Sequence, residues 1–241
     1  MIHKTRGIVF HVTDYSETSV VARIYTELFG VQSYLLKGAK RKKNKLHSGI
    51  LQPMSLLEME VYHKDHGGLQ YATEINNRPP FASIPYDMVK SSIVLFLNEI
   101  VYKSIREEEG NPLLFDFLHH AMRWLDAMDP VHPDFHLVFM VQLTRFLGFF
   151  PHGNPEDGSS YFDLAEGCFQ AIPPRHTQFL ETDLSKWLGE LLGTSLQNQE
   201  NLKIPREIKP MLTDKLIEYY SLHLSGFGNI KSHAVLEAVW A

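Results

Sequence analysis

The stretch that decides the fold runs from Val20 to Leu36 and reads VVARIYTELFGVQSYLL. In its first half, Val20, Ala22 and Ile24 occupy alternate positions, and after the Phe29-Gly30 turn a second alternating run leads to Leu36. Side chains of a β-strand point alternately to its two faces, so a repeat of two in hydrophobicity is typical of a strand. The sequence therefore predicts two neighbouring strands here.

Three further strands are predicted on either side of this stretch. Ile8, Phe10 and Val12 alternate before it, and residues 57–62 alternate after it. A Gly67-Gly68 turn then leads into a last strand over residues 69–75. Five short strands with turns at this spacing predict a small antiparallel barrel, of which the OB-fold is the five-stranded version.

The texture of the sequence changes after Asn77-Arg78-Pro79-Pro80, because two consecutive prolines neither continue a sheet nor lie inside a helix. Downstream, apolar residues recur at steps of three and four, which is typical of helices. We expect an α+β protein with an OB-fold domain at residues 1–80 and an α-helical domain at residues 81–241. Helices are predicted over Asp87–Ile105, Leu113–Met128, Pro133–Gly148, Asp183–Leu192, Pro205–Leu222 and Ser232–Val239, with Asp183 as an N-cap and Pro205 in a first turn.

An irregular insertion interrupts the predicted helices at residues 149–176, which are rich in proline, glycine and polar residues. One hairpin is expected within it, with strands at 161–164 and 168–171 about a Glu166-Gly167 turn.

Length and composition are ordinary for a globular protein: the chain has 241 residues, of which 44% are hydrophobic and 21% charged. A single cysteine, Cys168, excludes an intramolecular disulfide and fits a reducing compartment. Neither an export signal nor a membrane-spanning segment is indicated, so a cytoplasmic location is expected.

The strongest functional signal is a run of six cations within nine residues that contain no carboxylate. The whole chain has a net charge of −5, yet residues 1–80 hold 11 lysines and arginines against 7 aspartates and glutamates. Crowded like charges repel one another, and a polyanion such as nucleic acid would relieve that repulsion. The alternative is a solvated surface loop. The cations are Lys37, Lys40, Arg41, Lys42, Lys43 and Lys45.

Other candidate DNA-binding residues lie on the predicted strands. Arg6 and Arg23 would add positive charge, while Tyr25 and Tyr34 would offer rings on which bases stack. Because alternate residues of a strand face opposite sides of the sheet, these tyrosines could instead be buried or lie at the edge of the barrel. Lysine contacts to phosphate do not read bases, so binding is expected to be independent of sequence and sensitive to salt.

Enzyme and metal signatures are weak. His132, Asp134 and His136 are close in sequence but straddle Pro133, and Glu107–Glu109 resembles a solvated helix end. No nucleophile elbow, zinc-protease motif or phosphate-binding loop is present, and Cys168 has no evident base. We expect no catalytic residue and no metal site.

Several ordered segments carry a family resemblance. They include DYSETS at residues 14–19, YLLKGAKR at 34–41, LQPM at 51–54, LTRFLGFFP at 143–151 and NIKSHAVL at 229–236. Together with Gly7-Ile8-Val9, they resemble the RecO family of bacterial DNA repair proteins, and the resemblance spans nearly the whole chain.

This resemblance implies an N-terminal OB-fold joined to a helical domain, and a recombination mediator rather than an enzyme. It implies binding to single- and double-stranded DNA, annealing of complementary strands, and action with RecR to help RecA displace single-stranded-DNA-binding protein (SSB). The acidic tail of SSB would dock on the helical domain, where Arg123 and Arg145 are candidate anchors. Many members carry a four-cysteine zinc module, but residues 152–176 contain only Cys168, so we expect no cofactor and a hairpin held by packing.

Two other function classes stay open. A protein-only adaptor would act through the acidic helical domain without binding DNA directly. A hydrolase would need clustered carboxylates or histidines to hold a metal, and Glu107–Glu109 is the only tight acidic cluster.

Overall fold

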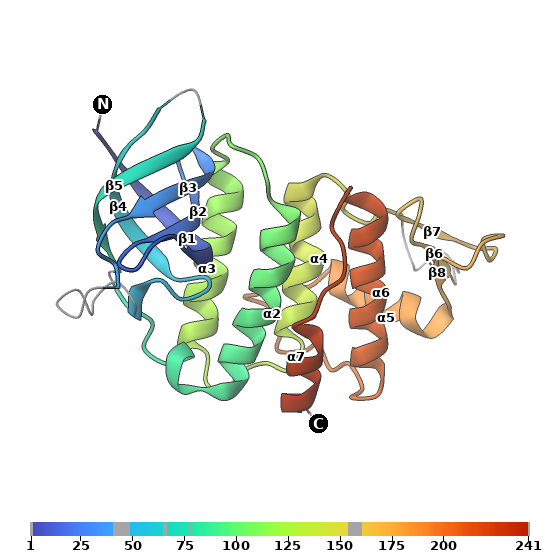
Figure 1. Ribbon diagram of the computed structural model, residues 1–241. Coiled ribbons are helices and arrows are strands. Elements are labelled where there is room, and N and C mark those ends of the chain that lie inside the picture. The colour runs from blue at the N-terminus through green and yellow to red at the C-terminus, as the bar shows by residue number, and fades with distance from the viewer. Residues whose placement is uncertain (1, 41–48, 65–66, 78, 154–160, 241) are drawn as a thin grey trace. The chain divides into compact units, whose positions relative to one another are not determined.

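The computed structural model describes residues 2–40, 49–64, 67–77, 79–153 and 161–240. The chain divides into two compact units, residues 1–127 and 128–241. The first contains the barrel with the helices that follow it, and the second contains the remaining helices and a small sheet (Figure 1). No helix in the described part of the chain is long and apolar enough to cross a lipid bilayer.

Five strands form a closed barrel in the order β1-β2-β3-β5-β4, as the sequence predicts. The β3–β5 pair is parallel and the other pairs are antiparallel, which is the strand order of an OB-fold. The strands are β1 (Ile2–Asp14), β2 (Val20–Thr26), β3 (Gly30–Leu36), β4 (Leu56–Tyr62) and β5 (Leu69–Asn76).

The barrel interior is filled by one side of each alternating strand. Val20, Ala22 and Ile24 of β2 point inward, and the buried cluster continues across the sheet to Tyr34 of β3 and Val61 of β4. The repeat of two thus turns a local pattern into a closed apolar core.

Two helices belong to the same unit as the barrel. A short 3-10 turn, η2 (Ile84–Tyr86), precedes α2 (Met88–Ser104), and α3 (Pro112–Ala127) follows. The loop between these helices contacts the barrel at the Phe29-Gly30 turn, where Val31 N donates to Glu107 O at 2.9 Å. Gly30 has φ +61° and a Cβ there would lie 2.5 Å from that carbonyl oxygen, so only glycine fits.

The second unit is built from α4 (Phe135–Leu147), α5 (Thr182–Leu192), α6 (Ile208–His223) and α7 (His233–Trp240). As predicted, α4 ends at Gly148, which adopts the left-handed conformation with φ 84°. Two predicted helix starts are wrong. The N-cap of α5 is Glu181 rather than Asp183, and α6 begins at Ile208, so Pro205 lies before it.

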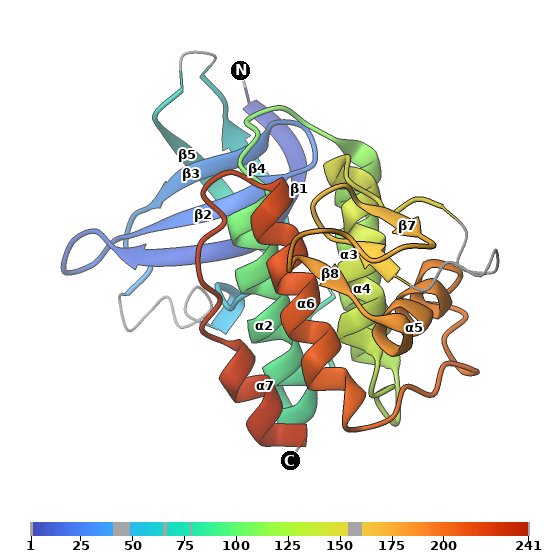
Figure 2. The same ribbon diagram turned by 90° about the vertical axis from the view of Figure 1, so that its right-hand side faces the viewer.

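The predicted hairpin is present in the second unit, and a third strand extends it. The strands β6 (Tyr161–Asp163), β7 (Cys168–Gln170) and β8 (Phe179–Leu180) form a sheet in the order β7-β6-β8. Figure 2 shows β8 close to α5, which also contacts β6. The third strand escapes a pattern search because two residues are too few to show a period.

Residues 81–127, predicted as part of a separate helical domain, group with the barrel in the first compact unit. The domain boundary near residue 80 stays a prediction.

Candidate nucleic-acid interface

One row of neighbouring strand positions crosses the barrel close to the basic run. Tyr62 of β4 pairs with Tyr71 of β5, and Tyr71 pairs with Leu35 of β3. The row continues from Leu35 through Val21 to Thr13. The basic run begins directly after β3, so its first residues leave the barrel at this row.

Lys37 and Lys40 are the members of the run that the structure describes, and both are exposed. The turn is held by a bond from Lys40 N to Thr18 O at 3.2 Å. The Lys40 ammonium lies 2.7 Å from Asp14 Oδ1, a surface pair that stabilises little and leaves the cation in solvent. Arg41, Lys42, Lys43 and Lys45 lie outside the described residues.

A cluster of aromatic and cationic side chains lies beside this turn. The Nζ atoms of Lys37 and Lys64 each lie 5.5 Å from the centre of the Tyr71 ring. In the sequence, the signal for this cluster is a lysine before the Gly67-Gly68 turn and a tyrosine after it. Alternation alone misses it, since the pattern of β5 does not tell which face is outward.

Arg6 lies away from this end of the barrel and is held by carboxylates. Its guanidinium donates to both oxygens of Glu27 at 2.7 and 2.9 Å, and to Asp116 Oδ1 at 2.8 Å. The Glu27 carboxylate foremost, together with Asp116, raises the pKa of Arg6, and Arg6 lowers the pKa of Glu27. Two carboxylates therefore already pair with the Arg6 guanidinium, which does not support a phosphate contact.

The remaining predicted cations are dispersed. Arg23 pairs with His11 midway along β1–β2, and its guanidinium lies 5.4 Å from the centre of the Tyr102 ring. Lys4 forms an ion pair with Glu60 at 3.1 Å. Arg6 and Lys40 contact opposite ends of the β1–β2 ladder, so the described cations do not form one continuous groove.

The expectation that Tyr25 and Tyr34 form an exposed stacking face is wrong, because their rings are 1% and 0% exposed. Tyr34 lies in the barrel core. Tyr25 stacks on Phe10 and contacts Phe115 of α3, and its hydroxyl donates to Asn111 O at 3.3 Å. Burial raises the pKa of both tyrosines to about 12.

The segment that corresponds to the zinc module of the RecO family does not offer a set of metal ligands among its described residues. Of the residues described between 149 and 176, only Cys168 supplies a thiol, while the buried Asp163 carboxylate is engaged by Gln170 and His176 at 3.1 Å each. Across the described part of the chain, no three histidine, cysteine or acidic side chains gather as metal ligands.

The His132–His136 segment forms a structural network. Asp134 is fully buried and its Oδ1 lies 2.7 Å from Lys209 Nζ, so a lysine supplies the cation at this carboxylate. His136 shares a 3.3 Å hydrogen bond with Thr213. Burial, with a smaller effect of Lys209, lowers the pKa of His136 to about 3, so the ring is neutral.

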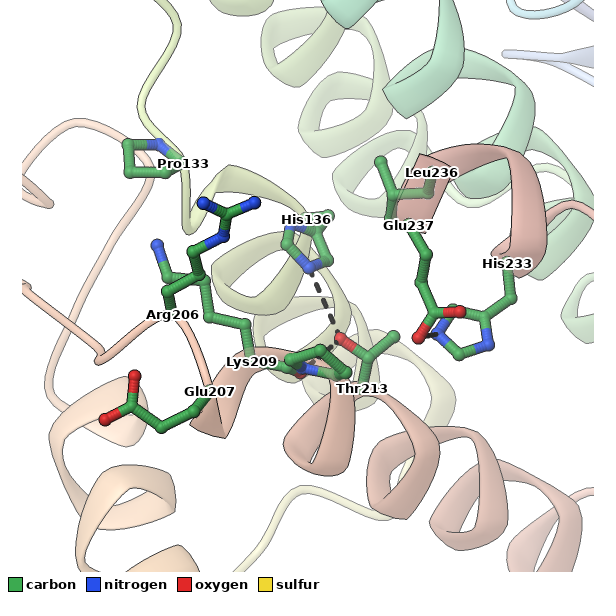
Figure 3. A pocket seen from close by; sticks show the side chains of 10 residues that line it. Pro133, His136, Arg206, Glu207, Lys209, Thr213, His233, Leu236 and Glu237 are labelled. Carbon is green, nitrogen blue, oxygen red and sulfur yellow. Dashed lines mark hydrogen bonds and ion pairs between the residues drawn. The ribbon is translucent and has the colours of Figure 1, made fainter. Parts of the chain in front are cut away.

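A pocket of about 480 Å³ opens beside this network, between residues of α4, α6 and α7 (Figure 3). Pro133, Pro210 and Leu236 give it apolar walls, and Figure 3 shows His136 directed toward Thr213. His233 lies 3.5 Å from Glu237, which also lines the pocket. Apolar walls with a few polar groups are typical of ligand-binding pockets.

The predicted partner anchors lie in different compact units. Arg123 is half-buried on α3, whereas Arg145 of α4 is exposed with its guanidinium 3.6 Å from the centre of the Phe150 ring. Their role in binding the tail of SSB stays a prediction.

The closed five-stranded barrel followed by helices defines the class: an OB-fold protein with a helical extension. Two family models cover the chain, "Recombination protein O N terminal" over residues 1–79 and "Recombination protein O C terminal" over residues 85–233. Similar proteins named DNA repair protein RecO come from Azobacteroides pseudotrichonymphae, 34% identical over 240 residues, and Bacteroides fragilis, 36% identical over 241 residues. Both matches span 100% of the two chains compared.

The chain therefore belongs to the RecO family. The expected family and fold class are confirmed, and with them its assignment to DNA repair and recombination.

Proposed function

We propose that this protein is a recombination mediator of DNA repair that binds DNA strands through its barrel and anneals them without catalysing a reaction. The observation that carries the proposal is the run of cations directly after β3 of the OB-fold barrel. Lys37 and Lys40 are exposed there, and four further cations follow in sequence. Membership of the RecO family supports it.

The mechanism needs only electrostatics and proximity. Lysines and arginines that contact phosphates release condensed counterions, and this release favours binding whatever the base sequence. Two complementary strands held on one protein repel each other less and meet at a higher local concentration. Base pairing then selects the correct partner strand, so no cofactor and no metal are required.

Partner proteins complete the proposed role. By its family resemblance, the protein works in the cytoplasm with RecR to help RecA displace SSB from single strands. The helical domain at residues 81–241 is the proposed docking region for the SSB tail. Within it, the pocket beside His136 is a candidate receptor for an apolar side chain.

The test neutralises Lys40, Arg41, Lys42 and Lys43 to glutamine and measures affinity for a single strand over a range of salt concentrations. If all four contact phosphates, the slope of log affinity against log salt falls by roughly 3, at about 0.7 for each lost contact. An unchanged slope would contradict the assignment of the loop. The matched control makes four exposed cations of the second unit neutral, and its slope should not change: Arg175, Lys186, Lys203 and Lys231.

A second candidate function is the protein-only adaptor, which the pocket in the second unit favours. An adaptor would leave labelled oligonucleotides unshifted in a mobility assay at moderate salt, whereas the mediator would retard them. Incubating labelled DNA with magnesium or manganese tests for hydrolysis, and we expect the strands to stay intact.

A further inference from the structure

Tyr71 differs from the other aromatic residues of the barrel in its surroundings. Its side chain is 38% exposed, and Tyr62, its partner across β4–β5, is 44% exposed. Residues directly opposite each other in an antiparallel pair point to the same face, so the two rings share one outward surface. Two aromatic rings thus lie side by side in solvent at the barrel end where the basic run begins.

Among the residues that the structure describes, the two lysines beside Tyr71 have no acidic partner. Within the described part of the chain, no carboxylate lies within ion-pair distance of either Lys37 or Lys64, whereas Lys4, Arg6 and Lys40 each have such a partner. Their ammonium groups instead lie near the electron-rich ring, an attraction that is weak at an exposed site. Both cations thus lie at the exposed ring, where an anion bound beside Tyr71 would meet them.

The backbone around this cluster is held in place by buried groups. Gln70 is fully buried, and its side-chain amide accepts from Lys64 N at 3.0 Å and donates to Lys64 O at 3.2 Å. The preceding His63 ring stacks on Phe29 with centres 3.9 Å apart. Burying an amide costs free energy unless both its N–H and its C=O groups form hydrogen bonds. Here both groups of Gln70 bond to the Lys64 backbone, which holds Lys64 next to Tyr71.

An exposed ring flanked by two cations has the chemistry of a stacking site for an unpaired base. A base can lie on the aromatic face while lysines contact the phosphates on either side of it, and this works for any base because each has a flat π-surface. A duplex keeps its bases stacked and paired inside, so only its phosphates would reach the lysines.

We propose that Tyr71, with Tyr62 beside it and with Lys37 and Lys64 flanking it, binds an unpaired base of single-stranded nucleic acid. The site makes the protein prefer single strands to duplex, a preference that the basic run by itself does not create. The inference rests on the proposed DNA-binding function and names the residues that would contact an unpaired base.

The experiment compares the full chain with Tyr71→Ala and Tyr71→Phe, using fluorescence anisotropy with a labelled oligothymidine and with a blunt-ended duplex of equal phosphate number. Tyr71→Ala should weaken single-strand binding by about 5- to 100-fold, since loss of one base–aromatic stack has that effect. Duplex affinity should change by less than about 2-fold, because phosphate contacts remain. Tyr71→Phe keeps the ring and should bind both ligands like the original chain.

The salt dependence separates stacking from charge. Tyr71→Ala should leave the slope of log affinity against log salt unchanged, whereas Lys37→Gln and Lys64→Gln should each lower it by about 0.7 on a single strand. The control variant is Tyr86→Ala, which removes an 87% exposed tyrosine of η2 in the same unit and should change neither affinity nor slope.

A Tyr71→Trp variant gives a direct signal that does not depend on tolerance of the alanine substitution. Its added indole should be quenched by oligothymidine and not by the blunt-ended duplex. Equal loss of affinity for both ligands in Tyr71→Ala, or quenching of Tyr71→Trp by neither ligand despite binding, would overturn the site. If the original chain binds neither ligand, the proposed function itself fails. If the original chain binds but Tyr71→Ala changes neither affinity, only this inference is rejected.

Discussion

The barrel and the small β7-β6-β8 sheet are both antiparallel in large part, but they are stabilised in different ways. Strands of the barrel are 7 to 13 residues long and close on themselves around a continuous apolar cluster. Strands of the small sheet have two or three residues and cannot enclose a core. The barrel is held mainly by many apolar contacts, each of which contributes a little.

The small sheet is organised by one carboxylate. Asp163 is 3% exposed, and its Oδ1 accepts the backbone N–H groups of Ala165 and Glu166 at 2.9 and 3.0 Å. Its Oδ2 accepts from Gln170 and contacts His176 at 3.1 Å each. One side chain thus connects the turn, β7 and the segment before β8.

Aromatic packing supports the same sheet. Phe162 contacts Phe169 and Tyr219, and the Tyr219 hydroxyl donates to Phe149 O at 2.6 Å. The comparison teaches that a short sheet concentrates its stability in few residues, whereas a closed sheet distributes it. Single substitutions should therefore have unequal effects in the two regions.

The largest effect is expected from Asp163→Ala, which leaves two backbone donors and two side-chain partners without their acceptor. The free energy of unfolding of the second unit should fall by about 2–4 kcal/mol, as for other buried hydrogen-bonded groups. Urea unfolding followed by fluorescence measures it. The control Asp183→Ala removes an exposed carboxylate from the first turn of α5 and should cost less than about 1 kcal/mol. Equal midpoints for the two variants would show that Asp163 does not organise the sheet.

A smaller effect is expected from Gly7→Ala in the barrel. A Cβ at Gly7 would lie 2.7 Å from Met59 Sδ and 2.8 Å from Ile24 Cγ2, so the core must shift to admit it. Overpacking of this kind costs about 1–3 kcal/mol, and the flexible Met59 side chain should keep the value in the lower half of that range.

The matched substitution is Gly49→Ala, where a Cβ would meet no atom within 4 Å. It should leave the barrel as stable as before or raise its stability by about 0.4–1 kcal/mol, because alanine restricts the unfolded chain. Thermal unfolding of both variants checks the pair, and a stable Gly7→Ala would mean that the barrel core has room that the structure does not show.

No effect is expected from metal removal. Since the Asp163 network rather than a cysteine cluster organises the small sheet, treatment with a chelator should leave the melting temperature unchanged in both regions. Elemental analysis of the purified protein should find no stoichiometric zinc. A full equivalent of zinc, or melting at lower temperature after chelation, would show that a metal stabilises the small sheet.

Much of the fold follows from sequence because the controlling patterns are local. Alternation in residues 20–36 defines β2 and β3, and Gly148 ends α4 where only a left-handed residue fits. The candidate interface was only partly predictable: the basic run is visible in sequence, whereas the cluster around Tyr71 needs contacts between residues 34 positions apart.

By itself, the amino-acid order determined the five-stranded barrel, the helices after it and the family, since periodicity and turn residues act over a few neighbours. Only the tertiary structure decided which tyrosine can meet a ligand. Tyr25 and Tyr71 both lie outside the barrel core cluster, but Phe115 of α3 covers the first and two lysines flank the second. Exposure depends on what packs against a face, and that partner is distant in sequence.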